Sequence, residues 1–149
     1  MAKEIPFVAI IFTLITLITG SLWGKPTWGT YWVWDARLTS FLILLFIYLG
    51  LIFIDKALKY NVNGDLSFSY LSIIGAINIP IIKFSVDWWN TLHQPASVIR
   101  EGGPSIHIEM LVPLMIMSLG IFLLFFYFIL TNIQSAIDER KFLFLSSKD

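Results

Sequence analysis

The sequence predicts an all-α membrane protein, a polytopic helix bundle with four transmembrane helices and two aromatic-rich outer loops. Apolar residues make up 57% of its 149 residues and charged residues only 13%, about half the ~25% of an average soluble domain. The few charges also divide the chain into four long uncharged runs. A soluble chain of this size could not cover so much apolar surface with polar groups. The composition therefore excludes a disordered protein and argues strongly against a soluble enzyme.

Each uncharged run is long enough to cross a bilayer, which takes roughly 17–25 residues as a helix. Helix is the expected form because lipid offers no hydrogen-bond partners to the backbone. We interpret the first run as a retained span, since residues 19–22 lack the small-residue site of a cleaved signal peptide. The expected spans, within a single membrane domain over 1–149, are about 5–24, 38–54, 66–82 and 110–137. An outer loop over 23–37, a polar turn near 61–65 and an outer loop over 83–109 connect them.

Lysine and arginine give a weak signal for orientation. Six of them lie in the N-terminus, the middle turn and the C-terminal tail, and four lie in the two longer loops. The positive-inside rule then places both termini in the cytoplasm and loops 23–37 and 83–109 on the outer side. A net charge of zero leaves no basic surface for nucleic acid. The absence of cysteine excludes disulfides and thiolate metal sites.

The tryptophans are concentrated in and beside the two outer loops. They are Trp23, Trp28, Trp32, Trp34, Trp88 and Trp89. An interfacial anchoring belt usually marks both faces of a membrane, whereas these residues mark one face. Indole rings gathered at one membrane face can form an aromatic surface, which suits a large, planar, apolar ligand. Periodicity does not decide the local structure, because Trp28, Trp32 and Asp35 have helical spacing while Trp28, Trp32 and Trp34 share strand parity.

The polar residues of the first loop have both functional and simple structural interpretations. Arg37 and Lys25 can meet carboxylates of a ligand, and Gly29 permits a turn or a close backbone approach. Asp35 can equally be the N-cap of the second span. Arg37 can equally be a charge that extends from the membrane edge toward water.

Two histidines are the remaining chemical candidates. His93 follows Trp88 and Trp89 in the second loop, and imidazole is the usual protein ligand of heme iron. A histidine in a polar loop is also commonly an ordinary hydrogen-bonding surface residue. His107 lies after a Gly-Gly-Pro segment and is a poor second ligand. No nucleophile elbow, phosphate loop or zinc-protease spacing is present, so we expect no enzyme activity.

The two outer segments together resemble a known family. The run 23–40, with Trp28-Gly29, Trp32 and Trp34-Asp35, resembles the tryptophan-rich WWD signature of heme-handling membrane proteins. The run 83–98, with the sequence DWWNTLHQ, is similar to the following outer-loop signature of one branch. That branch is the cytochrome c maturation protein C, or heme exporter protein C, family.

The resemblance implies a role in c-type cytochrome assembly in the bacterial inner membrane or its mitochondrial counterpart. Heme b, as a transferred ligand, would be presented at the periplasmic face to a membrane-anchored heme chaperone. ATP-binding cassette subunits and a small accessory membrane protein would assist. The resemblance also implies that His93 is an axial ligand of the iron. It further implies that the signature loop from Trp23 through Arg37 is the heme platform and the docking site of the chaperone. With His93, the expected heme-binding residues are Trp28, Gly29, Trp32, Trp34, Asp35, Arg37, Trp88 and Trp89.

The chain departs from the family in its number of spans. Members usually have six, with a first axial histidine between the first two, whereas this sequence begins with the equivalent of the third. We expect a fragment; a separate polypeptide carrying the first part, or heme binding through one axial ligand, are the alternatives. A non-heme structural subunit, whose aromatic loop docks a partner protein, is the alternative function.

Overall fold

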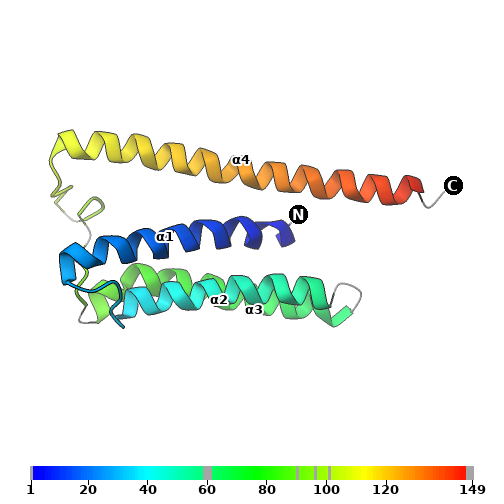
Figure 1. Ribbon diagram of the computed structural model, residues 1–149, viewed down its shortest axis with the longest axis horizontal. Helices are drawn as coiled ribbons and strands as arrows, with labels where there is room; N and C mark the ends of the chain where they lie inside the picture. The colour runs from blue at the N-terminus through cyan, green and yellow to red at the C-terminus, as the bar shows by residue number, and fades with distance from the viewer. Residues whose placement is uncertain (1, 59–61, 90, 96, 101, 147–149) are drawn as a thin grey trace. The chain divides into compact units, whose positions relative to one another are not determined.

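The computed structural model describes residues 2–58, 62–89, 91–95, 97–100 and 102–146, so Asn90 of the second motif lies outside the described residues. Throughout these ranges the regular structure is helical, with no strand. A short 3-10 helix, Ala2–Glu4, precedes four α-helices (Figure 1). These are α1 (Ile5–Trp28), α2 (Ala36–Ala57), α3 (Val62–Trp88) and α4 (Ile108–Ser146). The predicted all-α class is confirmed.

Each α-helix contains a stretch long and apolar enough to cross a membrane. The chain is therefore a multi-pass membrane protein with the four expected transmembrane helices. The helices extend beyond the uncharged runs that predicted them: α1 continues to Trp28, and α3 occupies 62–65 in place of the expected polar turn. A charged residue can lie on a helix in the headgroup region, so the first charge marks the edge of the apolar core and not the helix end.

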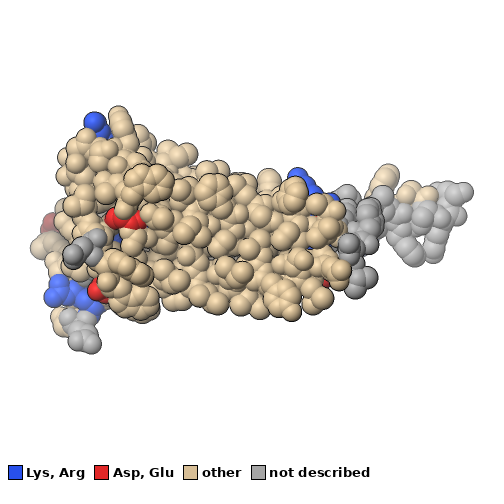
Figure 2. Space-filling model, turned by 90° about the horizontal axis from the view of Figure 1, so that it is seen from below, with Lys and Arg blue, Asp and Glu red and all other residues tan. Residues whose placement is uncertain are grey.

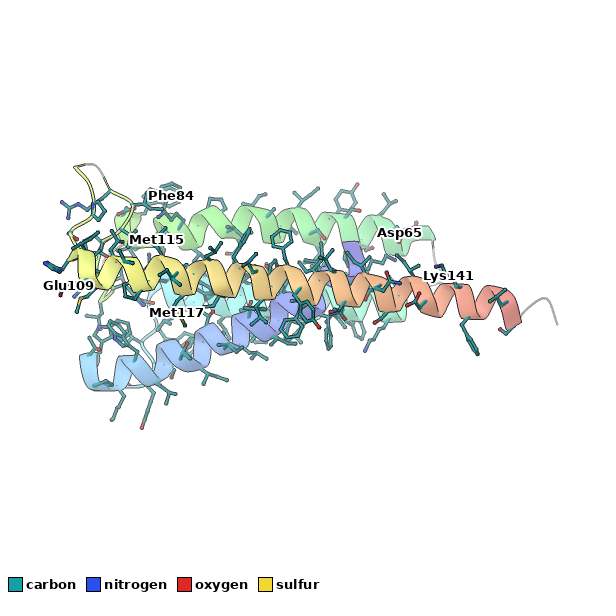
Figure 3. All side chains as sticks on the ribbon, turned by 90° about the horizontal axis from the view of Figure 1, so that it is seen from above. Asp65, Phe84, Glu109, Met115, Met117 and Lys141 are labelled. Atoms are coloured by element: carbon teal, nitrogen blue, oxygen red, sulfur yellow. The ribbon has the colours of Figure 1, made fainter. Side chains whose placement is uncertain are left out.

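Charged side chains flank the apolar stretches. In α4, Glu109 lies near one end and Lys141 toward the other, with Met115 and Met117 on the apolar part between them (Figure 3). On the face drawn in Figure 2, the lysine, arginine, aspartate and glutamate side chains lie toward the ends, and other residues form the surface between them. This distribution is typical of helices whose middle portions contact lipid.

The chain forms two compact units. One consists of Ala9–Pro95 and contains most of α1, all of α2 and α3, and both tryptophan-rich segments. The other consists of Met1–Val8 with Ala96–Asp149 and contains α4. All the residues that the first loop and the DWWNTLHQ motif contribute to a site therefore belong to one unit.

Within the larger unit, α2 and α3 pack side by side as an antiparallel pair (Figure 1). Two glycines bring the helices close together. A Cβ atom on Gly50 would lie 3.0 Å from Cδ2 of Leu71, and one on Gly75 would lie 3.1 Å from Cγ2 of Ile47. Neither position has room for a larger side chain without a shift of its neighbour. The buried core between the helices consists of Ile47, Leu51 and Phe68.

A polar contact joins the same two helices near the tryptophan-rich end. Nδ2 of the buried Asn78 donates to the carbonyl oxygen of Ser40 at 2.9 Å. In an apolar setting a buried amide needs such a partner. The contact fixes the beginning of α2 against the second half of α3. The second loop departs from the end of α3.

Candidate functional site

The first tryptophan-rich segment is part helix and part loop. α1 continues through Lys25 and Pro26 to its last residue, Trp28. Gly29 follows, and its φ of +79° is the left-handed conformation that glycine adopts readily. The N–H of Gly29 donates to the carbonyl of Lys25 at 3.0 Å, and Nζ of Lys25 donates to the carbonyl of Gly29 at 3.1 Å. The irregular loop is therefore 29–35 and shorter than the predicted 23–37.

Residues 29–35 form an irregular connection tied to α1. Oγ of Ser21 donates to the carbonyl of Tyr31 at 2.7 Å, and Oγ1 of Thr30 donates to the carbonyl of Trp32 at 3.2 Å. Nζ of Lys25 also lies 5.2 Å from the centre of the Tyr31 ring. Lys25 is thus engaged locally, which makes it a poorer candidate than Arg37 for meeting a ligand carboxylate.

Asp35 is the N-cap of α2, as its structural interpretation predicted. Its backbone is extended, and its Oδ1 accepts a hydrogen bond from the N–H of Leu38 at 2.8 Å. Only 5% of its side chain is exposed. The cap uses one carboxylate oxygen and leaves the other, Oδ2, for a second set of contacts.

Those contacts come from the second loop, more than fifty residues away. Oγ1 of Thr91 donates to Oδ2 of Asp35 at 2.6 Å, and Nδ1 of His93 lies 2.5 Å from the same oxygen. Thr91 also accepts the backbone N–H of His93 at 3.0 Å, which closes a tight local turn. The structure therefore brings together Asp35 and His93, two of the residues selected from the sequence.

Asp35 is an ionised acceptor in this arrangement. Burial by itself would raise its pKa, but hydrogen bonds from the Thr91 hydroxyl, the Leu38 N–H and His93 outweigh burial, and the pKa lies below its usual 3.8. A carboxylate offers no proton, so the proton between Asp35 and His93 belongs to Nδ1 of the imidazole. In the neutral ring, the nitrogen with a free lone pair is then Nε2.

Trp28 is the aromatic neighbour of this imidazole. The Trp28 and His93 rings meet edge to face with centroids 4.7 Å apart, and Trp23 packs edge to face on Trp28 at 5.4 Å. Gly24 makes room for this arrangement, because a Cβ there would lie 3.1 Å from Cε3 of Trp28 and 3.3 Å from the oxygen of Thr30. The last turn of α1 thus places an indole ring against the imidazole of His93.

The other tryptophans form separate pairs and not one flat face. Trp32 and Trp34 meet edge to face at 5.5 Å. Trp88 stacks on Phe84 at 5.4 Å and meets Trp89 at 6.0 Å. Trp34, Trp88 and Trp89 are exposed, whereas Trp32 is half-buried, and its enclosed Nε1 has no hydrogen-bond partner among the described residues.

An open groove of about 280 Å³ lies beside the polar cluster. Its lining consists of Val33, Trp34, Asp35, Thr91 and Leu92. Its volume is just below the ~300–1,000 Å³ of typical enclosed ligand pockets. The site is therefore an open surface on which a ligand can lie, lined by both polar and apolar side chains.

Arg37 belongs to the compact unit that contains this site, whereas His107 does not. Arg37 is half-buried in the first turn of α2, two residues after Asp35. His107 belongs to the other unit, where its Nδ1 lies 3.9 Å from a carboxylate oxygen of Glu109 and its side chain is 69% exposed.

Thr91 is the functional candidate that sequence reasoning did not single out. Its hydroxyl connects Asp35 with the backbone of His93. The Thr-x-His spacing indicates a side-chain turn of this kind. It gives no indication that the hydroxyl also reaches a carboxylate 56 residues earlier.

Comparison with known proteins decides the family. The family model described as "Heme exporter protein C" matches residues 1–146. The chain belongs to the heme exporter protein C family. A heme exporter protein C of Bradyrhizobium diazoefficiens is 50% identical over 140 residues, 94% of this chain and 53% of the relative. The putative cytochrome c biosynthesis ccmC-like mitochondrial protein of Marchantia polymorpha is 53% identical over 142 residues, 94% of this chain and 56% of that protein.

A third relative, the heme exporter protein C of Haemophilus influenzae, is 47% identical over 125 residues, 84% of this chain and 51% of that protein. The chain thus spans about half the length of these curated relatives. The Asp35–Thr91–His93 cluster lies in the part of the heme exporter protein C sequence that this chain contains.

Proposed function

We propose that this member of the heme exporter protein C family binds heme at the outer face of the membrane and presents it to a heme chaperone during c-type cytochrome biogenesis. Relatives named for heme export and for cytochrome c biosynthesis support the substrate and the process. The structural observation that carries the proposal is the Asp35–His93 contact beside Trp28. It combines an oriented imidazole with an aromatic surface, as heme iron and a porphyrin edge require.

His93 is the proposed axial ligand. Its Nδ1 is engaged by Asp35, and no hydrogen bond joins its Nε2 to any residue in the described ranges. Nε2 lies on the opposite side of the ring from Nδ1 and has the lone pair that iron needs. His93 is only 15% exposed, so its ring is held by protein contacts and is not a freely moving surface group.

The surrounding residues have proposed roles toward the porphyrin. Trp28 and Trp32 are half-buried, while Trp34, Trp88 and Trp89 are exposed and offer stacking area. The Arg37 guanidinium can pair with a propionate carboxylate, and Gly29 lets the backbone turn away at the end of α1. The groove beside Asp35 and Thr91 is open, so a heme bound against it would keep one side accessible to an acceptor.

We place this exchange on the periplasmic side of a bacterial inner membrane, with both termini cytoplasmic. The ligand is heme b, and the acceptor is a membrane-anchored heme chaperone. ATP-binding cassette subunits and a small accessory membrane protein complete the proposed assembly. The role is binding and transfer, in which this chain makes no new bond in the porphyrin.

Hemin titration of the purified protein in nanodiscs tests the proposal. We expect wild type and His107→Ala to give the same shifted Soret band, whereas His93→Ala weakens binding at least tenfold because the iron loses its ligand. The matched control is informative because the chain contains only two histidines. Equal binding by the two variants would contradict the assignment of His93. A wild-type chain that leaves the hemin spectrum unchanged would favour the structural-subunit alternative.

A further inference from the structure

We infer that Asp35 and Thr91 are positioning residues for heme: together they hold His93 as the Nδ1-protonated tautomer and make Nε2 a stronger iron ligand. The bound heme then has a lower reduction potential than an unsupported histidine would give it. This inference rests on the proposed role of His93 as ligand and adds how the chain controls that ligand.

The geometry gives Asp35 three donors at once. Its Oδ1 accepts from the Leu38 N–H at 2.8 Å, and its Oδ2 accepts from the Thr91 hydroxyl at 2.6 Å and lies 2.5 Å from Nδ1 of His93. With 5% of Asp35 and 15% of His93 exposed, little water competes for these bonds. The carboxylate is thus fixed at both oxygens, and its position determines where the imidazole lies.

Counting protons determines the tautomer. The Thr91 oxygen accepts the backbone N–H of His93 at 3.0 Å, and its single hydrogen is donated to Asp35. The 3.2 Å approach of Thr91 Oγ1 to Nδ1 therefore involves no threonine hydrogen. Asp35 is ionised at neutral pH and supplies none. Nδ1 must carry the hydrogen itself, so in the neutral ring Nε2 is the unprotonated nitrogen.

A carboxylate at Nδ1–H changes the electronic character of the ring as well as its orientation. It draws the proton toward itself and makes the opposite nitrogen more basic. A more basic ligand stabilises ferric over ferrous iron, and outer-shell hydrogen bonding of this kind is one of the protein's means of setting a heme potential. Loss of such a partner typically lowers metal affinity about 10–100-fold.

Asp35→Asn is the decisive variant because asparagine remains a good N-cap. If its single oxygen caps Leu38, its NH₂ group faces Thr91 and His93. A hydrogen on Nδ1 would then face the hydrogens of the amide, so the ring is driven to the Nε2-protonated tautomer, in which Nε2 has no lone pair for iron. Asp35→Ser retains the cap but removes the carboxylate, and it controls for helix stability.

Thr91 provides a second, milder pair of variants. Thr91→Ser retains the hydroxyl that bridges Asp35 and the His93 backbone, whereas Thr91→Val has the same shape without it. We expect Thr91→Ser to have the hemin affinity and reduction potential of wild type. In Thr91→Val both should change in the same direction as in Asp35→Asn, by a smaller amount.

The first measurement needs no heme. In a His107→Gln background His93 is the only histidine, and ¹⁵N NMR of its ring in nanodiscs reports the tautomer directly. We expect Nδ1–H in the parent and in Thr91→Ser, and Nε2–H in Asp35→Asn. The same tautomer in the parent and in Asp35→Asn would overturn the inference.

The second measurement uses bound hemin. We expect Asp35→Asn to bind about 10–100-fold more weakly, to raise the reduction potential and to lower the iron–histidine stretching frequency in resonance Raman spectra. A purely structural role would reduce the amount of folded protein without moving the potential of what binds. An unchanged potential and stretch in Asp35→Asn, with binding still lost in His93→Ala, would overturn this inference alone. Unchanged binding in His93→Ala would overturn the proposed function together with it.

Discussion

Nδ1 of His93 lies 2.5 Å from Oδ2 of Asp35, although the two residues are 58 positions apart in the sequence, with α2 and α3 between them. The other oxygen of the same carboxylate caps α2. One side chain therefore determines both the beginning of a helix and the orientation of the candidate ligand. The two interpretations of Asp35, cap and functional residue, are compatible because a carboxylate has two oxygens.

The Trp28 ring is expected to contribute to heme affinity through its contact with His93. Trp28→Leu removes the edge-to-face pair at 4.7 Å, and such pairs contribute about 0.5–1.5 kcal/mol. We expect hemin to bind about two- to tenfold more weakly in nanodisc titrations. Tyr70→Leu, an exposed aromatic on the membrane-spanning part of α3, is the control and should bind as wild type. Equal affinities for Trp28→Leu and wild type would show that the Trp28 ring has no part in binding.

Gly24 is expected to be intolerant of even one added methyl group. Its Cβ would lie 3.1 Å from Cε3 of Trp28 and 3.3 Å from a backbone oxygen, and overpacking of this kind typically costs about 1–3 kcal/mol. Gly24→Ala should lower the thermal unfolding midpoint in detergent and change tryptophan fluorescence.

Gly20→Ala is the matched control for Gly24→Ala in the same helix. Nothing lies within 4 Å of a Cβ at Gly20, and alanine favours helix over glycine. We expect its midpoint to be equal to or above that of wild type. If the two alanine variants unfold alike, the close packing of Gly24 against Trp28 does not limit stability.

Trp32 and Trp34 are expected to differ in their effects although they are neighbours in one loop. Trp32 is half-buried against α1, where it lines a groove with Leu17 and Leu22. Trp32→Ala should therefore destabilise the protein by about 1–2 kcal/mol, less than the 3–5 kcal/mol of a fully buried tryptophan. Trp34 is 76% exposed, so Trp34→Ala should have the unfolding midpoint of wild type. It should instead weaken the binding of heme or the capture of heme by the chaperone.

Thermal unfolding, membrane insertion and heme capture, measured on both tryptophan variants, check this division. Replacing both tryptophans should weaken capture by the chaperone more than it weakens insertion. Equal loss of capture and insertion would indicate that these residues act only as membrane anchors.

Asn78 is expected to stabilise the pairing of α2 with α3. Asn78→Leu removes the hydrogen bond to the carbonyl of Ser40 and should lower the free energy of unfolding by about 1 kcal/mol. Asn132→Leu is the matched control, because Asn132 Nδ2 donates within its own helix to the carbonyl of Phe128. A loss in Asn132→Leu as large as that in Asn78→Leu would rule out a specific effect of the interhelical bond.

The sequence by itself determined the number and class of the helices, because a bilayer requires uncharged segments of a minimum length and permits only helix for them. Its two signature segments also determined the family, which the comparisons confirmed. The resemblance selected His93 and Asp35 as site residues together. Their contact could not be predicted, since periodicity describes neighbours within one element and not side chains 58 residues apart.

Only the tertiary structure decided how these residues meet. The packing of α2 on α3, through Gly50, Gly75 and Asn78, sets the distance between the two segments at the ends of the helices. At that distance the Thr91 hydroxyl reaches a carboxylate, and the tryptophans separate into pairs instead of one flat surface. Hydrogen bonds and ring contacts depend on differences in distance of less than an ångström. Those distances follow from the packing of whole helices and from side-chain rotamers. A linear pattern of residue types contains no information on either.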